Sequence, residues 1–318
     1  MKKFCAIVLA LVLGVCGSAL ADGGLVTAYD AAEQLMYNTG NVTMNGTLNL
    51  YWNDTLVKKV QGKLLMDGED EYQRLDITTP GMWGFSVSNG YSVLAYGDKV
   101  YTISREMYGY ESDGHSQRTP YETILKKTDY TRELIKLGRL IVSEIDEKIG
   151  ERVTTEAETG GTVIRAELNA EDLPGETDTV VNLVWQYGVD RYYRADYIKQ
   201  MEYLPEEPQG YSTATKALVY TTDSFHVTAA KIEVALDAEG RIAGVTGEIA
   251  MDQNCRDGNV YPLRAEFTLT AGEYGTSQVQ GNEEIDAEMS EVVEIQNQAE
   301  DFGGPGLEEG EEDSKGNG

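Results

Sequence analysis

The side chains that could carry out chemistry are few and widely separated. The chain has only two histidines, His115 and His226, which lie far apart in different sequence contexts. A pair of histidines that binds a metal needs a short spacing or a third ligand nearby, and the sequence provides neither. We interpret both as surface histidines, and we predict no metal site and no cofactor.

Cys255 is the only cysteine outside the first twenty-one residues. A single thiol excludes an internal disulfide framework and a cysteine-rich zinc centre. The residue stands in the polar stretch Asp252–Gly258, which the sequence predicts to be a turn. We therefore interpret Cys255 as an incidental free thiol rather than a nucleophile.

Motifs of enzymatic chemistry are missing from the sequence. It contains no Gly-x-Ser-x-Gly, no phosphate-binding loop and no dinucleotide fingerprint. A hydrolase built from dispersed carboxylates is an alternative, because such carboxylates leave no motif. We predict a protein that is not an enzyme and has no catalytic residues.

The first twenty-one residues have the layout of a secretory signal peptide. Lys2 and Lys3 give a positive start, and Phe4–Val15 is an apolar run too short to span a bilayer. The small-x-small pattern that ends at Ala21 predicts cleavage there, with Asp22 as the first mature residue. We therefore expect export to the periplasm or to the extracellular side of the cell envelope.

Lipid attachment at Cys16 is the competing interpretation of the same leader. The residue before a lipidated cysteine should be small, and Val15 is not, so cleavage after Ala21 is favoured. No later stretch is apolar for long enough to form a transmembrane helix. The expected protein therefore has no transmembrane segment, and its oligomeric state stays open.

The chain is strongly acidic, with a formal net charge of −28. Nucleic acid and anionic membrane surfaces repel such a chain, so we exclude nucleic acid as a partner. Thirteen Asp or Glu and a single lysine fall within residues 281–318, which predicts a disordered acidic tail. The expected organisation is a signal peptide at 1–21, one domain at 22–280 and this tail.

Three stretches carry helical patterns. Thr131–Ile149 has apolar residues at steps of three and four with charged residues on its other faces, which predicts an amphipathic helix. Leu25–Asn38 predicts a first, shorter helix. Thr177–Tyr193 is ambiguous between a strand and a helix, and we favour a helix because the stretch is long and apolar on both sides. A hairpin is expected around Gly160-Gly161, between Thr131–Ile149 and Thr177–Tyr193.

Most other segments alternate apolar and polar residues with the period of two that half-buried strands show. Val42–Trp52 is the first, and its return strand should place Leu56, Val60, Leu64 and Met66 on one face that Lys58 interrupts. A closing meander of three strands is centred on residues 230–236, 243–251 and 263–269. Met107–Arg118 is predicted to be a polar loop. Turns are predicted at Asn53-Asp54, Asp67-Gly68, Pro80-Gly81, Asn89-Gly90 and Gly97-Asp98.

These elements predict an α+β fold in which helices cover one face of an antiparallel sheet. The sheet is built from two instalments, that is, two groups of strands separated in the sequence by helical stretches. The order of elements over residues 25–280, and stretches such as 42–48 and 232–247, resemble the bacterial lipoprotein-carrier family (LolA-like). The resemblance implies a curved antiparallel sheet, an incomplete β-barrel, whose concave face holds helices over an apolar cavity for acyl chains. The family's functional residues have no matching motif here, so none is transferred.

The aromatic composition fits an amphipathic groove. The chain has 20 tyrosines but only 5 phenylalanines and 3 tryptophans, and tyrosine suits surfaces that are half apolar and half wet. Strand propensity explains the same composition without a groove. The candidate cleft residues are Leu48, Leu50, Trp52, Leu64, Trp83, Phe85, Trp185, Val234, Ile249 and Phe267.

Two functions of different classes follow from this fold. The first is a secreted cell-envelope binding protein whose apolar cleft takes a lipid or a lipid-modified partner. The alternative is an envelope sensor or adaptor that binds another protein and has a filled core. Phe267 discriminates between them, because its ring lines either an open cleft or a packed interior.

Overall fold

The computed structural model describes residues 24–80, 86–97, 99–106, 109–115, 129–149, 153–185, 222–255 and 258–281. Its strands are β1 (Asn41–Trp52), β2 (Thr55–Asp67), β3 (Asp70–Pro80), β4 (Ser86–Tyr96), β5 (Lys99–Glu106), β6 (Gly109–His115), β7 (Thr154–Glu158), β8 (Gly161–Asn169), β9 (Thr222–Asp237), β10 (Ile242–Cys255) and β11 (Val260–Gly272).

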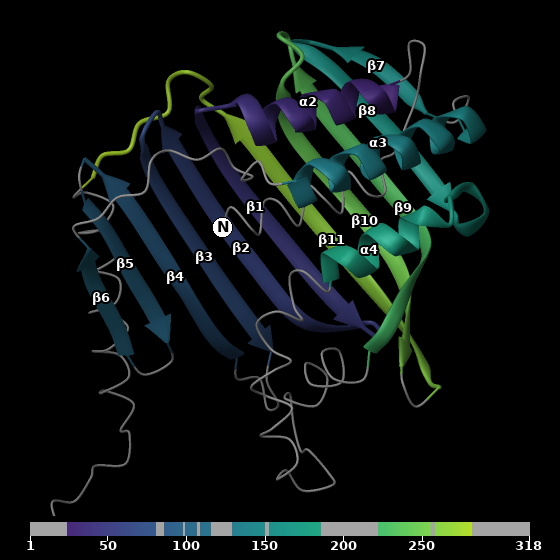
Figure 1. The fold of residues 1–318 in the computed structure, drawn as a ribbon, viewed down its shortest axis with the longest axis horizontal. Helices are drawn as coiled ribbons and strands as arrows, with labels where there is room; N and C mark the ends of the chain where they lie inside the picture. The colour runs from purple at the N-terminus through teal and green to yellow at the C-terminus, as the bar shows by residue number, and fades with distance from the viewer. Residues whose placement is uncertain are drawn as a thin grey trace, which may run out of the picture.

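All of these strands belong to one antiparallel sheet of 11 strands, in the order β6-β5-β4-β3-β2-β1-β11-β10-β9-β8-β7. The first instalment runs outward from β1 to β6, and the second runs inward from β7 to β11. The pairing of β1 with β11 joins them, from Thr43↔Gly272 to Trp52↔Leu263. The sheet is curved and does not close (Figure 1), so the predicted α+β class with an open antiparallel sheet is confirmed.

Within the described ranges, the α-helices α2 (Gly24–Asn38), α3 (Asp129–Ile149) and α4 (Glu176–Trp185) lie on one face of the sheet. Both α2 and α4 contact the second instalment, and α3 packs on α2 and α4 (Figure 1). The predicted helices at Leu25–Asn38 and Thr131–Ile149 are confirmed. The ambiguous stretch is helical over 176–185, and residues 186–193 lie outside the described ranges.

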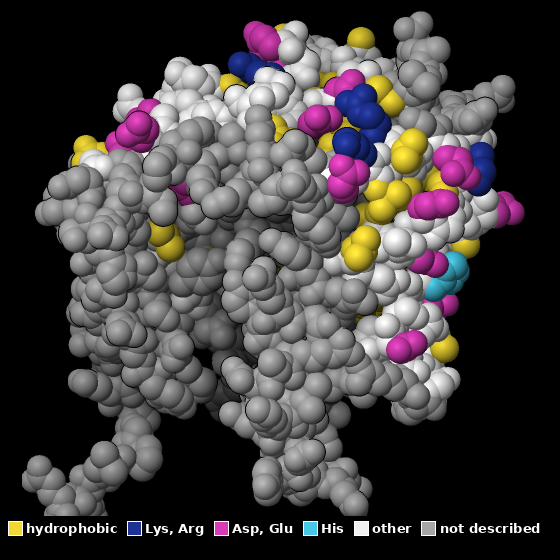
Figure 2. Space-filling model, viewed as in Figure 1, with side chains coloured by type: hydrophobic (Ala, Val, Ile, Leu, Met, Phe, Trp, Pro, Cys, Tyr) yellow, Lys and Arg dark blue, Asp and Glu magenta, His cyan; other side chains and the backbone are white. Residues whose placement is uncertain are grey.

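The packing of α2 on α3 is built around Tyr29. This residue is 1% exposed, and its hydroxyl donates a hydrogen bond of 2.6 Å to the backbone carbonyl of Ile135. Gly138 faces the ring, and a Cβ atom there would lie 3.2 Å from the tyrosine oxygen. Arg139 forms ion pairs with Asp30 and Glu33 at the solvent side of this contact. Charged side chains of both signs cover the outward surface of the helices (Figure 2).

The two faces of the sheet follow the predicted alternation. On β1, Val42 and Met44 are both 0% exposed in the core cluster shared with the helices. Thr43 and Asn45 point to the opposite, outer face, because side chains alternate along a strand. No helix in the described part of the chain is both long and apolar enough to cross a membrane.

One predicted turn is wrong. Asn89 and Gly90 lie inside β4, where they pair with Ile77 and Asp76 of β3. Gly90 also pairs with Arg105 of β5. The two-residue hairpin signal is local, and ladders on both sides of the strand override it.

Two further predictions placed loop where the chain is strand. Within Met107–Arg118, the segment 109–115 forms the edge strand β6, because backbone hydrogen bonds to β5 need no apolar alternation. Within Asp252–Gly258, β10 continues to Cys255, which is 6% exposed, and residues 256–257 lie outside the described ranges. The backbone N–H of Gly258 donates to the carbonyl of Cys255 at 2.9 Å.

Residues 273–281 form a strap that leaves β11 and crosses the ends of β1–β4 (Figure 1). The side chain of Asn41 fixes the strap, since its amide accepts from the N–H of Ser277 at 2.8 Å and donates to the carbonyl of Ser277 at 3.0 Å. Val279 is buried in a second apolar cluster on the outer face, with Leu65, Tyr72 and Leu94.

Candidate ligand-binding surface at the margin of the core

The predicted cleft residues fall into three groups. Leu64, Val234, Ile249 and Phe267 are each at most 2% exposed and pack in the main core cluster. Leu48, Leu50 and Trp52 are half-buried and pack against the edge of that cluster. Trp83 and Phe85 lie outside the described residues, and so does the side chain of Trp185, the last residue of α4.

Phe267 shows why the first group is packed. Its ring lies over Gly247 of the neighbouring strand, where a Cβ atom would come within 2.4 Å of the ring edge. Glycine is therefore required opposite this phenylalanine, and the ring fills the space that a side chain would take. Phe267 is a core residue in this structure.

The second group continues sideways into a surface that we name the margin strip: Leu48, Leu50, Trp52 and Ile77. The register places Leu48 opposite Val60, and Val60 opposite Ile77, so these side chains are neighbours across β1, β2 and β3 on the helix-facing side. All four strip residues are half-buried. The contacts of α2 and α4 with the sheet concentrate on β8, β9 and β10, away from these strands.

Trp52 is held rigidly at one end of the strip. Its indole N–H donates to the Gln253 side chain at 2.9 Å, and the Gln253 amide donates to the Thr222 hydroxyl at 2.7 Å. Gln253 is 0% exposed, so this chain of hydrogen bonds satisfies a buried amide. The Tyr261 ring packs at 4.9 Å from the Trp52 ring. The tryptophan therefore presents a preformed apolar wall.

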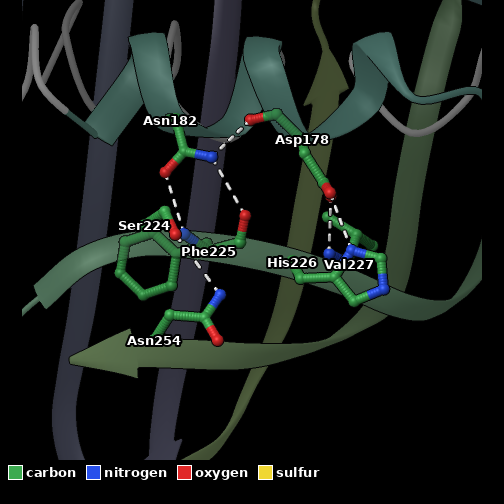
Figure 3. A network of polar contacts seen from close by, with 7 residues as sticks. All are labelled: Asp178, Asn182, Ser224, Phe225, His226, Val227 and Asn254. Carbon is green, nitrogen blue, oxygen red and sulfur yellow. Dashed lines mark hydrogen bonds and ion pairs between the residues drawn. The ribbon is translucent and has the colours of Figure 1, made fainter. Parts of the chain in front are cut away.

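Side chains of α4 form hydrogen bonds with the backbone of β9 beyond the part of β9 that pairs with β8 (Figure 3). The β8 ladder reaches β9 only from Ala229 to Asp237. Beyond it, the amide of Asn182 accepts from the N–H of Phe225 at 2.8 Å and donates to its carbonyl at 2.9 Å. A carboxylate oxygen of Asp178 accepts from the N–H of Val227 at 2.8 Å. These bonds fix the position of α4 over the sheet.

His226 belongs to this anchor. Its Nδ1 atom lies 2.7 Å from the second carboxylate oxygen of Asp178 (Figure 3). The hydrogen bond and the charge of Asp178 raise the pKa of His226. The ring is 53% exposed, and Asp178 is already committed to the backbone of β9. The arrangement is a surface ion pair at a helix anchor, in agreement with the interpretation of His226 as a surface residue.

The outer face of the sheet is polar over β8–β11. A groove of about 630 Å³ crosses β8–β11 and β1 there, and among the cleft candidates whose side chains are described only Phe267 touches it. Its charged side chains are paired: Arg165 with Glu233 at 2.7 Å and Lys231 with Glu167 at 2.9 Å. Among the described residues, no group of three or more His, Cys, Asp or Glu side chains could hold a metal ion.

Lys58 was predicted only as an interruption of the apolar face of β2. The regular β1–β2 ladder places Lys58 opposite Leu50 on the helix-facing side, and a bulge follows between Leu50 and Tyr51. Val57, the extra residue, enters the core at 5% exposure. The predicted inward position of Leu56 is wrong, because the bulge pairs it with the outward Tyr51. Burial lowers the pKa of the Lys58 ammonium group.

Comparison with known proteins gives distant likenesses only. No family model and no curated protein sequence matches the chain. A LolA superfamily protein from Nitrosomonas europaea is similar at 9% identity, covering 82% of this chain and 97% of that one, with a TM-score of 0.21. A dehydratase from the difficidin assembly line has 11% identity, covers 85% and 87%, and has a TM-score of 0.15.

A variant of a dehydratase domain from Mycobacterium tuberculosis is similar at 12% identity, covering 76% of this chain and 80% of that one, with a TM-score of 0.12. These superpositions are too loose to assign a family, a ligand or a reaction.

Proposed function

We propose that this protein binds an apolar chain, either a lipid acyl group or the lipid-modified part of a partner, along the margin strip. The observation that carries the proposal is the change from a fully buried to a half-buried apolar surface along a single face of β1. Half-buried apolar side chains next to a packed core are the surface that a ligand of this kind covers.

The strip has the features of a preformed binding surface. Leu48 and Leu50 supply aliphatic area, and Trp52 is fixed by the hydrogen bond to Gln253. Ligand binding would therefore require little ordering of these side chains, which favours affinity. The proposal includes export by the leader at 1–21 and membership of the LolA-like carriers, both supported by sequence features.

A mass spectrum of small molecules released from the gently purified full chain tests this function. We expect a bound acyl species, and we expect the neutral dye Nile red to compete with it. Leu50→Gln should weaken dye binding about tenfold, because it places an amide where apolar surface is needed. Thr47→Gln, on the outer face of the same strand, is the matched control and should bind the dye normally.

The alternative function is a sensor or adaptor that binds another envelope protein. The full burial of Leu64, Val234, Ile249 and Phe267 favours it, because a filled interior leaves no room for a ligand at these positions. A parent protein that unfolds cooperatively, releases no lipid and binds no dye would support the adaptor and overturn the carrier.

A further inference from the structure

We propose that the ligand of the margin strip carries an anionic head group, a carboxylate or a phosphate, and that Lys58 pairs with that group. This inference rests on the function proposed above and goes further, because it names the polar end of the ligand.

The position of Lys58 is set by the β2 ladder. The residue lies opposite Leu50 on β1, and Val60, two positions along the same strand, lies opposite both Leu48 and Ile77. The side chain of Lys58 therefore rises from the same face as the strip residues. A ligand that lies along the strip passes within reach of its ammonium group.

The surroundings of Lys58 are apolar. Its cross-strand neighbour Leu50 and its same-face neighbour Val60 both pack with the core. The side chain is half-buried, and its desolvation lowers the pKa of the ammonium group. A cation held in apolar surroundings loses hydration, and an anion placed beside it restores that loss.

No carboxylate among the described residues pairs with Lys58. Other lysines of the same ranges are paired: Lys231 with Glu167 at 2.9 Å, and Lys148 with Glu144 at 3.2 Å. The acidic side chains of β3 nearest to it alternate onto the outer face, as Asp76 does in its pair with Arg74. Lys58 is therefore free, within the described chain, to take an anion from a ligand.

Lysine side chains also extend their ammonium groups to water along apolar surfaces. In that case Lys58 would contribute only its methylene groups to the strip. The two roles differ in one measurable respect: a pairing lysine makes the protein prefer an anionic ligand over a neutral one of the same chain length, and an extended lysine does not.

The test compares three ligands of twelve carbons: laurate, dodecyl phosphate and 1-dodecanol, each added to the full chain at pH 7.5 with Nile red displacement as the readout. We expect an anionic ligand to bind about tenfold more tightly than the alcohol, the size of one charge-assisted hydrogen bond. The tighter of the two anions identifies the head group.

Lys58→Met removes the charge and keeps the length of the side chain, so it should abolish the preference and leave the affinity for 1-dodecanol unchanged. Lys59→Met is the matched control, because Lys59 alternates onto the outer face, and it should keep the preference. Equal binding of all three ligands by the parent overturns the role of Lys58 and leaves the apolar strip standing. Binding of none of them overturns the proposed function itself. The comparison of the three ligands uses the unmutated protein, so it does not depend on the folding of a variant.

Discussion

The two ends of β1 share one face and differ in what covers them. Val42 and Met44 are 0% exposed and belong to the cluster that includes Leu35 and Met36 of α2. Leu48 and Leu50 continue the same alternation and are half-buried. Apolar alternation therefore specifies which side of a strand faces inward, whereas the helices decide how much of that side becomes a packed core.

The largest expected effect sharpens the contrast between core and strip. Phe267→Ala should lower the free energy of unfolding by about 3–5 kcal/mol, because it empties a fully packed site over Gly247. Leu50→Ala should cost less, about 1–2 kcal/mol, since the side chain is only half-buried. Urea unfolding measures both.

The control for these two variants is Lys231→Ala. Lys231 is 62% exposed in its ion pair with Glu167, and exposed ion pairs contribute little to stability. Arg264 would not serve as such a control, because its guanidinium lies 4.1 Å from the centre of the Tyr51 ring and pairs with Glu266. A small loss at Phe267 together with altered dye binding would show that the ring lines a ligand cavity.

The anchor of α4 is the next effect in size. Asn182→Ala should cost about 2–3 kcal/mol, because it removes two side-chain hydrogen bonds to the backbone of Phe225. Asn254→Ala is the control, since that amide makes one hydrogen bond of 3.3 Å to Ser224 and should cost well under half as much. Urea unfolding measures the two variants. Equal losses of unfolding free energy would contradict the role of Asn182 as the anchor of α4.

The strap should contribute to stability, and the acidic tail should not. Val279→Ala should cost about 1–2 kcal/mol, because it removes buried methyl groups from the cluster with Leu65 and Tyr72. Deletion of residues 282–318 should leave the melting temperature nearly unchanged, because that segment is acidic and has few apolar anchors. Calorimetry on both proteins checks this, and a drop of many degrees on deletion would show that the tail docks on the domain.

The smallest effect concerns pH. The hydrogen bond and charge of Asp178 raise the pKa of His226 in the folded state, so the pair contributes stability below the unfolded pKa of about 6.5. That contribution is lost as the pH rises through the folded pKa. Because the ring is exposed, His226→Gln should cost no more than about 1 kcal/mol at pH 5.5 and close to nothing at pH 9. A cost that grows with pH would contradict this sign.

The sequence predicted the elements that depend on local patterns. The spacing in Thr131–Ile149 and the alternation in β9–β11 led to correct helices, strands and faces. The predicted turn at Asn89-Gly90 was wrong because strand pairing on both sides of β4 outweighs a local turn preference. Lys58 was predicted only as an interruption of an apolar face. Its lack of a carboxylate partner among the described residues depends on the three-dimensional arrangement, which the sequence does not show.

The anchor of α4 could not be predicted for a different reason. Asp178 and Asn182 meet the backbone of β9 more than 40 positions further along the chain. That contact depends on where β8 ends along β9, which no spacing in the sequence encodes. The division of the cleft candidates into packed and half-buried residues depends on the helices in the same way.

Photocrosslinking places the ligand most directly. A lauric acid that carries a diazirine on its chain would be bound to the full protein, irradiated, and mapped to individual residues by mass spectrometry. We expect labels on Leu48, Leu50 and Ile77, and we expect excess laurate to compete them away. Labels on the outer-face residues Thr246 and Thr268, or no competable label at all, would contradict it.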